Sequence, residues 1–573
     1  MRGPAPERYP RRRRHGKRFV PAAGTDLCHP PLVGWESPGG EHRRRGVEAL
    51  KLSPKHSWLL AGVLAFLAVV LTFDPKLYIN GDNVDYMNLA RGVRHGHLWA
   101  SDKYPPLFPM VLAPVQALFG MRLLPQKILV TLFAAGAIGL LAGIVRRRAG
   151  PRSGPWLLFV SATLIPFVEY AHYVMSEVPF LFFQLGAIAA CDRLRDRAAA
   201  HPAGRSTVCL ALWIAAAFYT RTAGVALAAG VVLWLLLSRR PRHAIVLAGF
   251  LTIAAVPWIL HALATTGGSP YVRQLLQVNP YYPEFGTLSA VGFLQRMGEN
   301  ARIYFLGIVP ITVMPALYGS TYSPPEMQKL FYPPWISIPL LIPFAAGLWR
   351  GLGGDGPKPK RVGVPASEFK ADPVVCVVLL SLLLVCVWPA IWAGSRFLVP
   401  ITPLLLLVWW RGWGLPEEIG LWGHWNKART GLLVIMLLLG VRNLIFYTQE
   451  TRSYPPEWEN YFSSLAWIRE NTPKDAVIID RKPGFAEYTA ERKARNFPRE
   501  ADPTRMIESF RMCGATHVVL SALPYDDIDR YLRPALEKRP ASFRLVHQTS
   551  EPATYVLEFY PEDGGGLTAP GVR

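Results

Sequence analysis

Long stretches without any Asp, Glu, Lys or Arg constrain this chain more than any other feature. Residues 58–73, 128–145, 222–238 and 373–395 are four such stretches. A helix needs about 20 residues to cross about 30 Å of hydrocarbon, because each residue adds about 1.5 Å. One apolar run can be a buried helix of a soluble protein, but a whole series of them cannot. The sequence therefore predicts a polytopic α-helical membrane protein.

The composition agrees with that fold class. Hydrophobic residues make up 51% of the chain and charged residues only 18%, whereas soluble domains carry about 25% charged residues. We expect about eleven spans. They are residues 58–73, 123–145, 155–172, 174–191, 206–220, 222–238, 243–263, 333–349, 373–395, 396–412 and 430–448.

The formal net charge of +22 fits either nucleic-acid binding or Lys and Arg retained on the cytoplasmic side of a membrane. Short basic connections between the expected spans favour the second interpretation, so nucleic acid is not an expected partner. The connections contain Arg146, Arg147, Arg148 and Arg152; Arg193, Arg195, Arg197 and Arg205; Arg239, Arg240 and Arg242; and Lys358, Lys360 and Arg361.

The basic connections also indicate which segments cross the membrane. With the N-terminus inside, they all fall on the cytoplasmic side only if residues 105–119 do not span. That segment holds four prolines, which do not suit an unbroken spanning helix. We therefore expect an interfacial or re-entrant segment there, and we interpret residues 303–320, with Pro310 and Pro315, in the same way.

Three domains are expected. Residues 1–55 are basic and rich in Gly and Pro, and are either a disordered cytoplasmic tail or a stretch ahead of the true start codon. Residues 56–449 form the transmembrane domain, with outer loops at 74–122 and 264–332. Residues 450–573 are polar, and the count of spans places them outside the membrane.

The C-terminal region alternates helical and strand-like runs, which predicts a small α/β domain. The expected helices are residues 458–471 and 503–513, and the expected strands are 476–480, 517–520 and 555–560. No catalytic group stands out. We interpret Asp480 with Arg481, and Asp526 with Asp527, as ordinary loop charges, and we expect the domain to position an acceptor or to be structural.

Asp82 and Asp85 follow the first span, three residues apart. If this piece is helical, Asp82, Asp85 (or Tyr86) and Leu89 share one face. Two carboxylates at a membrane–water interface can act as a general base and its orienting partner. They can also bind a metal or cap a helix, and the spacing alone leaves these alternatives open.

The surrounding residues resemble those of a known family. Asp82-Asn83, Tyr86, Ala90, Gly96 and the run Lys103-Tyr104-Pro105-Pro106-Leu107 are similar to the first outer loop of the GT-C glycosyltransferases, in the branch of the protein O-mannosyltransferases and the bacterial lipid A aminoarabinose transferases. Residues 172–179, 219–224 and 396–403 are similar to later motifs of that family, so the resemblance covers roughly residues 57–450. The family often has Asp-Glu at Asp82-Asn83, which leaves the second acid to Asp85 or to no residue.

The resemblance implies a membrane glycosyltransferase of the cell membrane that needs no cofactor. Its donor would be a sugar on a polyprenyl phosphate, and its acceptor a hydroxyl of a lipid, glycan or protein outside the membrane, with inversion at the sugar. The resemblance puts the base at Asp82, with Asp85 in support at most. Tyr86 and Glu177 are expected near the donor, although first-turn capping is an equal alternative for Glu177.

The leaving lipid phosphate requires fixed cations near the outer headgroups. Lys103, Arg221 and Arg396 are the candidates. Arg221 and Arg396 would lie at the outer ends of helix hairpins, against the positive-inside trend, and charge at such depth suggests function. Snorkelling of each side chain to the headgroups is the alternative.

Weaker candidates lie in the same outer loops. Arg273, Arg296 and Arg302 are possible phosphate ligands, and Tyr281-Tyr282 could contact sugar or lipid. His95 and His97 are near Asp82, but spacing alone does not make them metal ligands. None of the six cysteines forms a metal-like pair, and no metal is expected. The competing function classes are a transporter or flippase of lipid-linked sugar, for which no internal repeat is found, and a non-catalytic scaffold.

Overall fold

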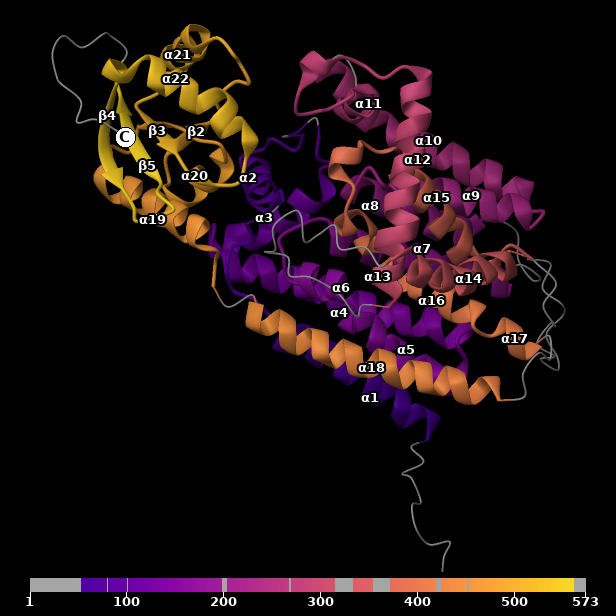
Figure 1. Cartoon of the computed structure of the whole chain (residues 1–573). Helices are drawn as coiled ribbons and strands as arrows, with labels where there is room; N and C mark the ends of the chain where they lie inside the picture. Colours follow the sequence, from indigo (N-terminus) through magenta and orange to yellow (C-terminus); the bar gives the residue numbers. More distant parts are fainter. Residues whose placement is uncertain are drawn as a thin grey trace, which may run out of the picture. The chain divides into compact units, whose positions relative to one another are not determined.

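The computed structural model describes residues 53–560, except residues 80, 100, 102, 198–203, 267–268, 315–332, 354–370, 419–423 and 451–452. Residues 1–52 of the N-terminal tail, the basic cluster at Lys358–Arg361 and residues 267–268 and 315–332 of the predicted loop 264–332 therefore lie outside the described residues. The described chain consists of a helical body followed by a small α/β domain (Figure 1).

Four helices of the body are long and apolar enough to cross a membrane, judged by length and composition. They are α1 (Pro54–Leu71), α4 (Leu123–Arg148), α10 (Pro241–Thr266) and α18 (Trp425–Glu450). The other helices of the bundle are α5 (Gly150–Thr163), α6 (Ile165–Tyr170), α7 (Glu177–Arg197), α8 (Gly204–Thr220), α9 (Gly224–Leu237), α14 (Pro334–Gly351), α15 (Pro373–Val387), α16 (Thr402–Gly412) and α17 (Leu415–Glu418). The architecture is that of a helical membrane fold, and the count of eleven spans remains a prediction.

Two predicted spans are wrong in extent, and proline explains both. The expected span at 155–172 is interrupted at Leu164, whose backbone is extended (φ −67°, ψ 123°) before the short helix α6 with Pro166 in its first turn. The expected span at 373–395 ends at Val387, because Trp388 precedes Pro389 and is extended (φ −69°, ψ 155°). Pro166 has no N–H to bond the carbonyl four residues earlier, and its ring would clash with that carbonyl, so the first helix is interrupted before it. Trp388 is the residue before a proline and therefore avoids the helical region of φ and ψ.

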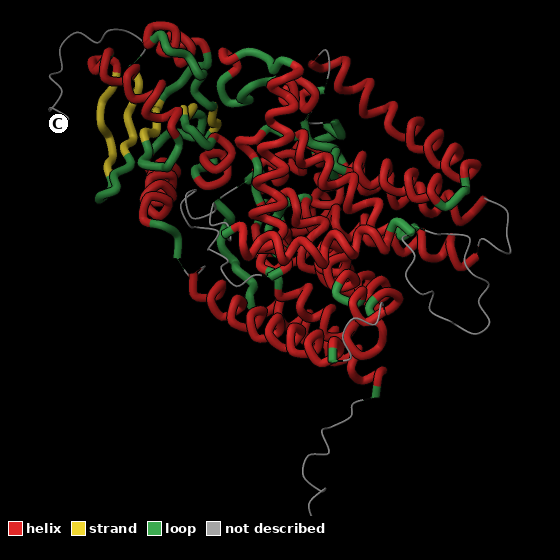
Figure 2. Tube along the Cα trace, turned by 45° about the vertical axis from the view of Figure 1, so that its right-hand side comes forward, coloured by secondary structure: helices red, strands yellow, loops and turns green. Residues whose placement is uncertain are grey.

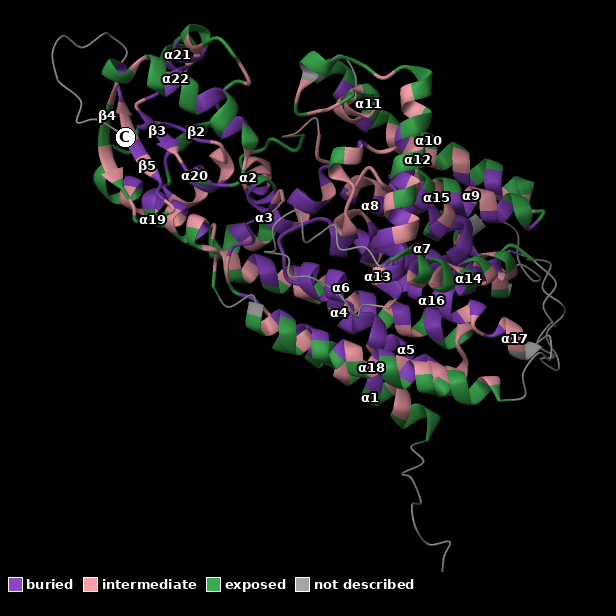
Figure 3. Ribbon diagram, in the orientation of Figure 1, coloured by how far each residue is buried: buried purple, intermediate pink, exposed green. Residues whose placement is uncertain are grey.

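The buried core lies inside the bundle, and apolar side chains also face outward. Helices α4, α7 and α16 are surrounded by other helices, so Leu185 and Leu405 are fully buried. Helix α10 instead exposes Ile245, Ile253 and Leu260. Figure 3 shows exposed residues along α1, α10 and α18, at the edges of the bundle. An apolar outer surface suits contact with lipid rather than water.

Two shorter helices lie at the end of the bundle where α1 ends and α4 begins. Helix α2 (Asn83–Arg94) packs against α3 (Leu107–Phe119). Helix α3 has 13 residues and contains Pro114, so it is about 20 Å long and too short for a span of about 30 Å. The position of α3 in the membrane interface, as predicted for 105–119, remains a prediction.

The predicted loop at residues 264–332 contains α11 (Pro270–Leu276) and the single turn η1 (Pro283–Phe285). Helix α12 (Ala290–Ile303) then continues through a π-helical turn, η2 (Tyr304–Ile308), into α13 (Val309–Val313). The 3-10 turns η4 (Ala390–Trp392) and η5 (Ser395–Ile401) connect α15 to α16. These connections bring the residues of the later outer loops to the same end of the bundle as α2.

The C-terminal domain contains a five-stranded sheet of order β2-β1-β3-β5-β4. Its strands are β1 (Val477–Ile479), β2 (Lys493–Arg495), β3 (His517–Leu520), β4 (Phe543–Gln548) and β5 (Tyr555–Phe559). Strand β1 runs parallel to β2 and β3, and β5 runs antiparallel to β3 and β4. The helices are α19 (Pro456–Asn471), α20 (Pro483–Thr489), α21 (Pro503–Met512) and α22 (Arg533–Lys538), which follows the π-helical turn η6 (Ile528–Leu532); the 3-10 turn η7 (Pro540–Ser542) leads into β4. Figure 2 shows the strands gathered within this domain and helices in the rest of the chain.

The interpretation of two acids in this domain as ordinary loop charges is wrong. The Asp480 side chain is fully buried at the end of β1 and accepts a 2.5 Å hydrogen bond from the Tyr461 hydroxyl. Asp527 is also buried, and its carboxylate pairs with Arg481 at 2.6 Å and with Arg499 at 3.3 Å.

Candidate active site

The chain between α1 and α2 is fixed by a buried lysine. The Lys127 side chain, in the first turns of α4, is 1% exposed. Its ammonium donates 2.6 Å to the Asp74 carbonyl and also donates to the Lys76 carbonyl. This arrangement satisfies a buried charge with backbone acceptors. It anchors the start of the segment that leads to Asp82.

The turn before α2 has a backbone that requires glycine. Gly81 has φ +96°, and a Cβ there would lie 2.7 Å from the Met175 side chain and 3.4 Å from a guanidinium nitrogen of Arg396. The positive φ strains any other residue at this position, and the Met175 side chain would have to shift to make room for a Cβ. The Asn83 amide then donates 2.7 Å to the Tyr78 carbonyl. Asn83, at the position where the resembling family often has an acid, is therefore buried in the turn.

Three charged side chains from distant segments meet next to this turn and its Asp82. They are Glu177, Arg221 and Arg396. The Arg396 guanidinium donates from Nη2 to Asp82 Oδ2 at 2.6 Å and from Nε to Glu177 Oε1 at 2.6 Å. Arg221 Nη1 approaches the same Glu177 oxygen at 2.8 Å. Glu177 is 0% exposed. The predicted Asp82, Glu177, Arg221 and Arg396 thus form one connected cluster.

The helix-capping alternatives for the two acids can be compared with this geometry. Asp82 occupies the N-cap position of α2, but its side chain makes no capping hydrogen bond. Glu177 opens α7, yet its Oε1 binds two arginines and its Oε2 has no hydrogen-bond partner in the described part of the chain. Both carboxylates therefore serve the ionic cluster.

Tyr86 and Ser176 connect α2 to the same cluster. Their hydroxyl oxygens are 2.8 Å apart, and Arg221 Nη1 donates to the Ser176 oxygen at 3.0 Å. The Tyr86 ring is buried and packs edge-on against Phe108 with centroids 5.1 Å apart. Tyr86 therefore holds α2 and α3 against the start of α7 and orients Arg221.

The other two predicted residues, Asp85 and Lys103, lie close to Asp82. The Lys103 ammonium is 3.1 Å from the Tyr104 hydroxyl, which donates to Asp85 Oδ2 at 3.5 Å. Burial, and then the negative charges of Asp82 and Asp85, raise the pKa of the Tyr104 hydroxyl well above its usual value. Tyr104 therefore stays protonated and remains a hydrogen-bond donor toward the acids.

The pKa of Asp82 and the pKa of Asp85 are shifted in opposite directions. Burial alone would raise the pKa of Asp82, but the positive charges of Arg396 and Lys103 outweigh it and hold that pKa below its usual value. For Asp85, desolvation by the surrounding protein and the negative charge of Asp82 raise the pKa to about 6. The Asp85 side chain keeps accessible surface while protein atoms crowd around it.

Sequence reasoning missed two residues beside the cluster. Glu169 is 3% exposed and accepts a 3.4 Å hydrogen bond from Tyr78, whose ring stacks on Tyr173 with centroids 3.7 Å apart. Tyr271 of α11 lies close enough to Arg221, Asp82 and Arg396 for their charges to act on its pKa, although burial is the largest influence and raises it. The only sequence signals were that Glu169 is an acidic residue three positions before His172 and that Tyr271 is a tyrosine near the start of the predicted loop 264–332.

The weaker candidates are dispersed. Arg296 is buried, and its guanidinium binds the backbone carbonyls of residues 275, 277 and 278, so it shapes the loop rather than facing the cluster. Arg302, His95 and His97 are exposed. Tyr281 and Tyr282 lie under the guanidinium groups of Arg499 and Arg530 at 5.2 and 4.9 Å from the ring centroids. Within the described residues, no group of three His, Cys, Asp or Glu is arranged to hold a metal ion.

A second ionic cluster lies at the opposite ends of the same helices. Arg148 at the end of α4 donates to Asp192 at 2.8 Å and to Asp372 at 3.0 Å. Asp372, the N-cap of α15, also binds Arg411 at the end of α16. A buried arginine held by two carboxylates is a structural arrangement that fixes four helix ends.

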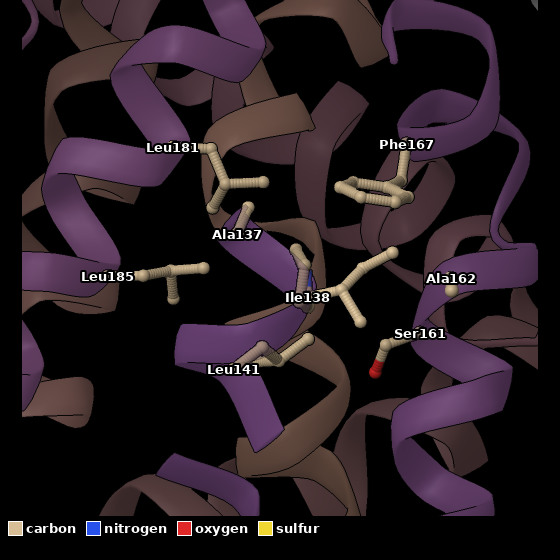
Figure 4. A pocket seen from close by; sticks show the side chains of 9 residues that line it. Ala137, Ile138, Leu141, Ser161, Ala162, Phe167, Leu181 and Leu185 are labelled. Atoms are coloured by element: carbon tan, nitrogen blue, oxygen red, sulfur yellow. The ribbon is translucent and has the colours of Figure 1, made fainter. Parts of the chain in front are cut away.

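A small apolar recess lies within the bundle. It is bordered by Ala137, Leu141, Phe167, Leu181 and Leu185, with the Ser161 hydroxyl as a polar group at its edge (Figure 4). That hydroxyl is already bonded to the Leu157 carbonyl at 2.8 Å. The recess offers no polar group to orient a substrate.

Comparison with known proteins supports the fold. No protein-family model matches the chain, and no curated protein matches it in sequence. Among solved structures, the oligosaccharyltransferase AglB from Archaeoglobus fulgidus, in complex with zinc and sulfate, has a TM-score of 0.53 at 12% identity over 88% of this chain and 73% of AglB. The same protein with an inhibitory peptide and a dolichol-phosphate gives a TM-score of 0.51 at 12% identity over 87% and 74% of the two chains.

A further solved structure, ArnT from Cupriavidus metallidurans bound to undecaprenyl phosphate, covers 90% of this chain and 99% of ArnT at 15% identity, with a TM-score of 0.47. AglB, whose two structures above have TM-scores of 0.51 and 0.53, is a glycosyltransferase of the GT-C superfamily. The chain has the GT-C fold. This confirms the fold that the motifs around Asp82 predicted.

Proposed function

We propose that this protein is a membrane glycosyltransferase. It transfers a sugar from a polyprenyl-phosphate donor to a hydroxyl of an extracytoplasmic lipid, glycan or protein, with inversion at the sugar carbon. The observation that carries the proposal is the convergence of Asp82, Glu177, Arg221 and Arg396 from four separate segments of a GT-C fold. AglB, which shares that fold, was solved with a dolichol-phosphate.

The cations match what the leaving group requires. When the glycosidic bond breaks, the lipid phosphate takes up negative charge, and fixed cations lower the energy of that state. Arg221 and Arg396 are held by the buried Glu177, so their positions are fixed before the donor arrives. Lys103 supplies a third positive charge close to Asp82.

The Arg396 contact also suggests how donor binding would activate the base. In this structure Asp82 is paired with Arg396 at 2.6 Å, and a carboxylate held in this way is a weak base. A phosphate that draws Arg396 toward itself reduces the positive charge felt by Asp82, which raises its affinity for a proton. Asp82 then accepts the proton of the acceptor hydroxyl as the oxygen attacks the sugar carbon.

Asp85 and Tyr104 complete the site. Asp85 would accept a hydrogen bond from another acceptor hydroxyl and keep the nucleophilic oxygen oriented. Tyr104, a donor beside both acids, would hold the carboxylates in place. The proposed mechanism uses only the residues of this chain and the two substrates.

A test starts with membranes that contain the full-length protein and a panel of radiolabelled polyprenyl-phosphate sugars, with membranes lacking the protein as control. We expect one donor to lose its label to a product outside the lipid phase, with the opposite anomeric configuration. Movement of intact donor across the vesicle membrane, without cleavage, would instead identify a flippase. Retention of label in every donor would refute the proposed transfer.

A further inference from the structure

The C-terminal domain contacts the candidate active site directly. Gly484, at the start of α20, lies so close to α2 that an added Cβ would be 3.1 Å from Asp85 Oδ1 and 3.6 Å from Val84 Cγ1. One turn further along α2, the Asn88 side-chain amide donates a 3.3 Å hydrogen bond to the Glu487 carboxylate of α20. The contact therefore extends along one side of α2, and it includes the acid itself.

The turn that makes this contact is held rigidly. It connects β1 to α20 and begins with Asp480, whose buried carboxylate is bonded to the Tyr461 hydroxyl. Arg481 is fixed by its 2.6 Å ion pair with Asp527. The turn lies at the carboxyl end of β1, between its parallel neighbours β2 and β3. In open parallel sheets this edge is where binding residues gather.

Lys482 is the residue of this turn that remains available. It makes no ion pair with any residue that the structure describes, its side chain is half-buried, and its ammonium lies 4.9 Å from the centroid of the Tyr525 ring. The groups that act on Asp85 from the packed elements are Asp82, Lys103, Tyr104 and Lys482, with Glu487 nearby on α20. Lys482 is the positive charge that comes from the other domain.

We infer that the turn at residues 480–484 forms a wall of the active site and that Lys482 is a positioning residue for the Asp85 carboxylate. The inference rests on the proposed function and assigns the C-terminal domain a part in catalysis. Lys482 keeps Asp85 ionised beside the like charge of Asp82, and Gly484 allows the wall to approach without displacing the acid. The ionised Asp85 can then orient the acceptor hydroxyl.

The test measures Asp85 itself and needs no substrate. Dicyclohexylcarbodiimide reacts with protonated carboxyl groups, and peptide mass spectrometry of the full-length protein in nanodiscs gives the fraction of Asp85 modified between pH 4 and 8. In the unmodified chain, half-labelling is expected near pH 6. Lys482→Met should move that midpoint upward by about 0.5 to 1 pH unit, because an opposite charge is lost.

Two variants serve as controls. Lys482→Arg keeps the charge and should restore the original midpoint. Lys493→Met removes an exposed lysine from β2 of the same domain and should leave the midpoint unchanged. An unchanged midpoint in Lys482→Met, or an equal shift in Lys493→Met, would overturn the inference. Once the donor is known, the decrease of the transfer rate at low pH must shift together with the labelling midpoint. A decrease that keeps its original midpoint in Lys482→Met would also overturn the inference.

Failure of this inference and failure of the proposed function give different results. The labelling midpoints report the ionisation of Asp85 and need no donor, so they are obtained even if no polyprenyl-phosphate sugar is consumed. A shifted midpoint with no transfer from any donor would leave the contact in place and refute the glycosyltransferase.

Discussion

Replacing Arg396 with lysine separates the two things that this residue supplies, charge and geometry. The guanidinium spans two carboxylates at once, Glu177 through Nε and Asp82 through Nη2, both at 2.6 Å. An ammonium keeps the charge but is a single point, so it can hold only one of them. The side chains of Arg396 and Asp82 are 27% and 26% exposed, so water screens part of the loss.

One charge-assisted hydrogen bond is worth about 1.5 to 3 kcal/mol, which corresponds to about a 10- to 100-fold decrease in kcat/KM at about 1.4 kcal/mol per factor of ten. The assay is initial-rate transfer from the active donor, expressed per folded protein after thermal unfolding in detergent. Arg411→Lys is the matched control, since Arg411 is 21% exposed and binds a buried acid at the other end of the bundle. It should lower Tm without lowering kcat/KM. Equal losses of kcat/KM in both variants, or none in Arg396→Lys, would refute the assignment of Arg396 to the active site.

Three further predictions follow from the same geometry. The transfer rate should fall as the pH drops through about 6, because Asp85 then takes up a proton, and Asp85→Asn should abolish that limb in a pH–rate profile. Gly484→Ala should reduce the rate about tenfold by placing a methyl group 3.1 Å from Asp85, whereas Gly298→Ala, with open space around the new carbon, should leave the initial rate unchanged. Burial raises the pKa of Asp480 to about 6, above its unfolded value. The contribution of Asp480 to stability is therefore present at low pH and is lost as the pH rises from about 4 through 6. Asp480→Asn should flatten the dependence of Tm on pH in that window, and an unchanged slope would contradict the raised pKa of Asp480.

The fold class and much of the site could be predicted because they depend on local signals. Apolar runs marked the long helices α1, α4, α10 and α18 at nearly their observed positions. Charge placed against the positive-inside trend identified Arg221 and Arg396, and the structure brings both to Glu177. The order of weak motifs led to the GT-C fold, although the sidedness of the helices and the number of spans remain predictions.

The remainder depends on tertiary contacts that no local pattern encodes. Strands β2 and β4 were missed because β2 has three residues with exposed Lys493 and Arg495, and β4 is mostly accessible. Glu169 and Tyr271 reach the cluster only through packing, and Lys482 only because two domains meet at Gly484. The burial of Asp480 likewise depends on Tyr461, which comes from the helix preceding β1.

The most direct test of the central claim is the initial rate of sugar transfer by Asp82→Asn, measured beside the unmodified protein in the same membranes with the active donor at saturation. Asp196→Asn, which removes a half-exposed carboxylate from the far end of α7, is the matched control. We predict a loss of about 100- to 10,000-fold for Asp82→Asn, the usual contribution of a general base, and no loss for Asp196→Asn. Equal rates for Asp82→Asn and the unmodified protein would contradict the assignment of Asp82 as the base.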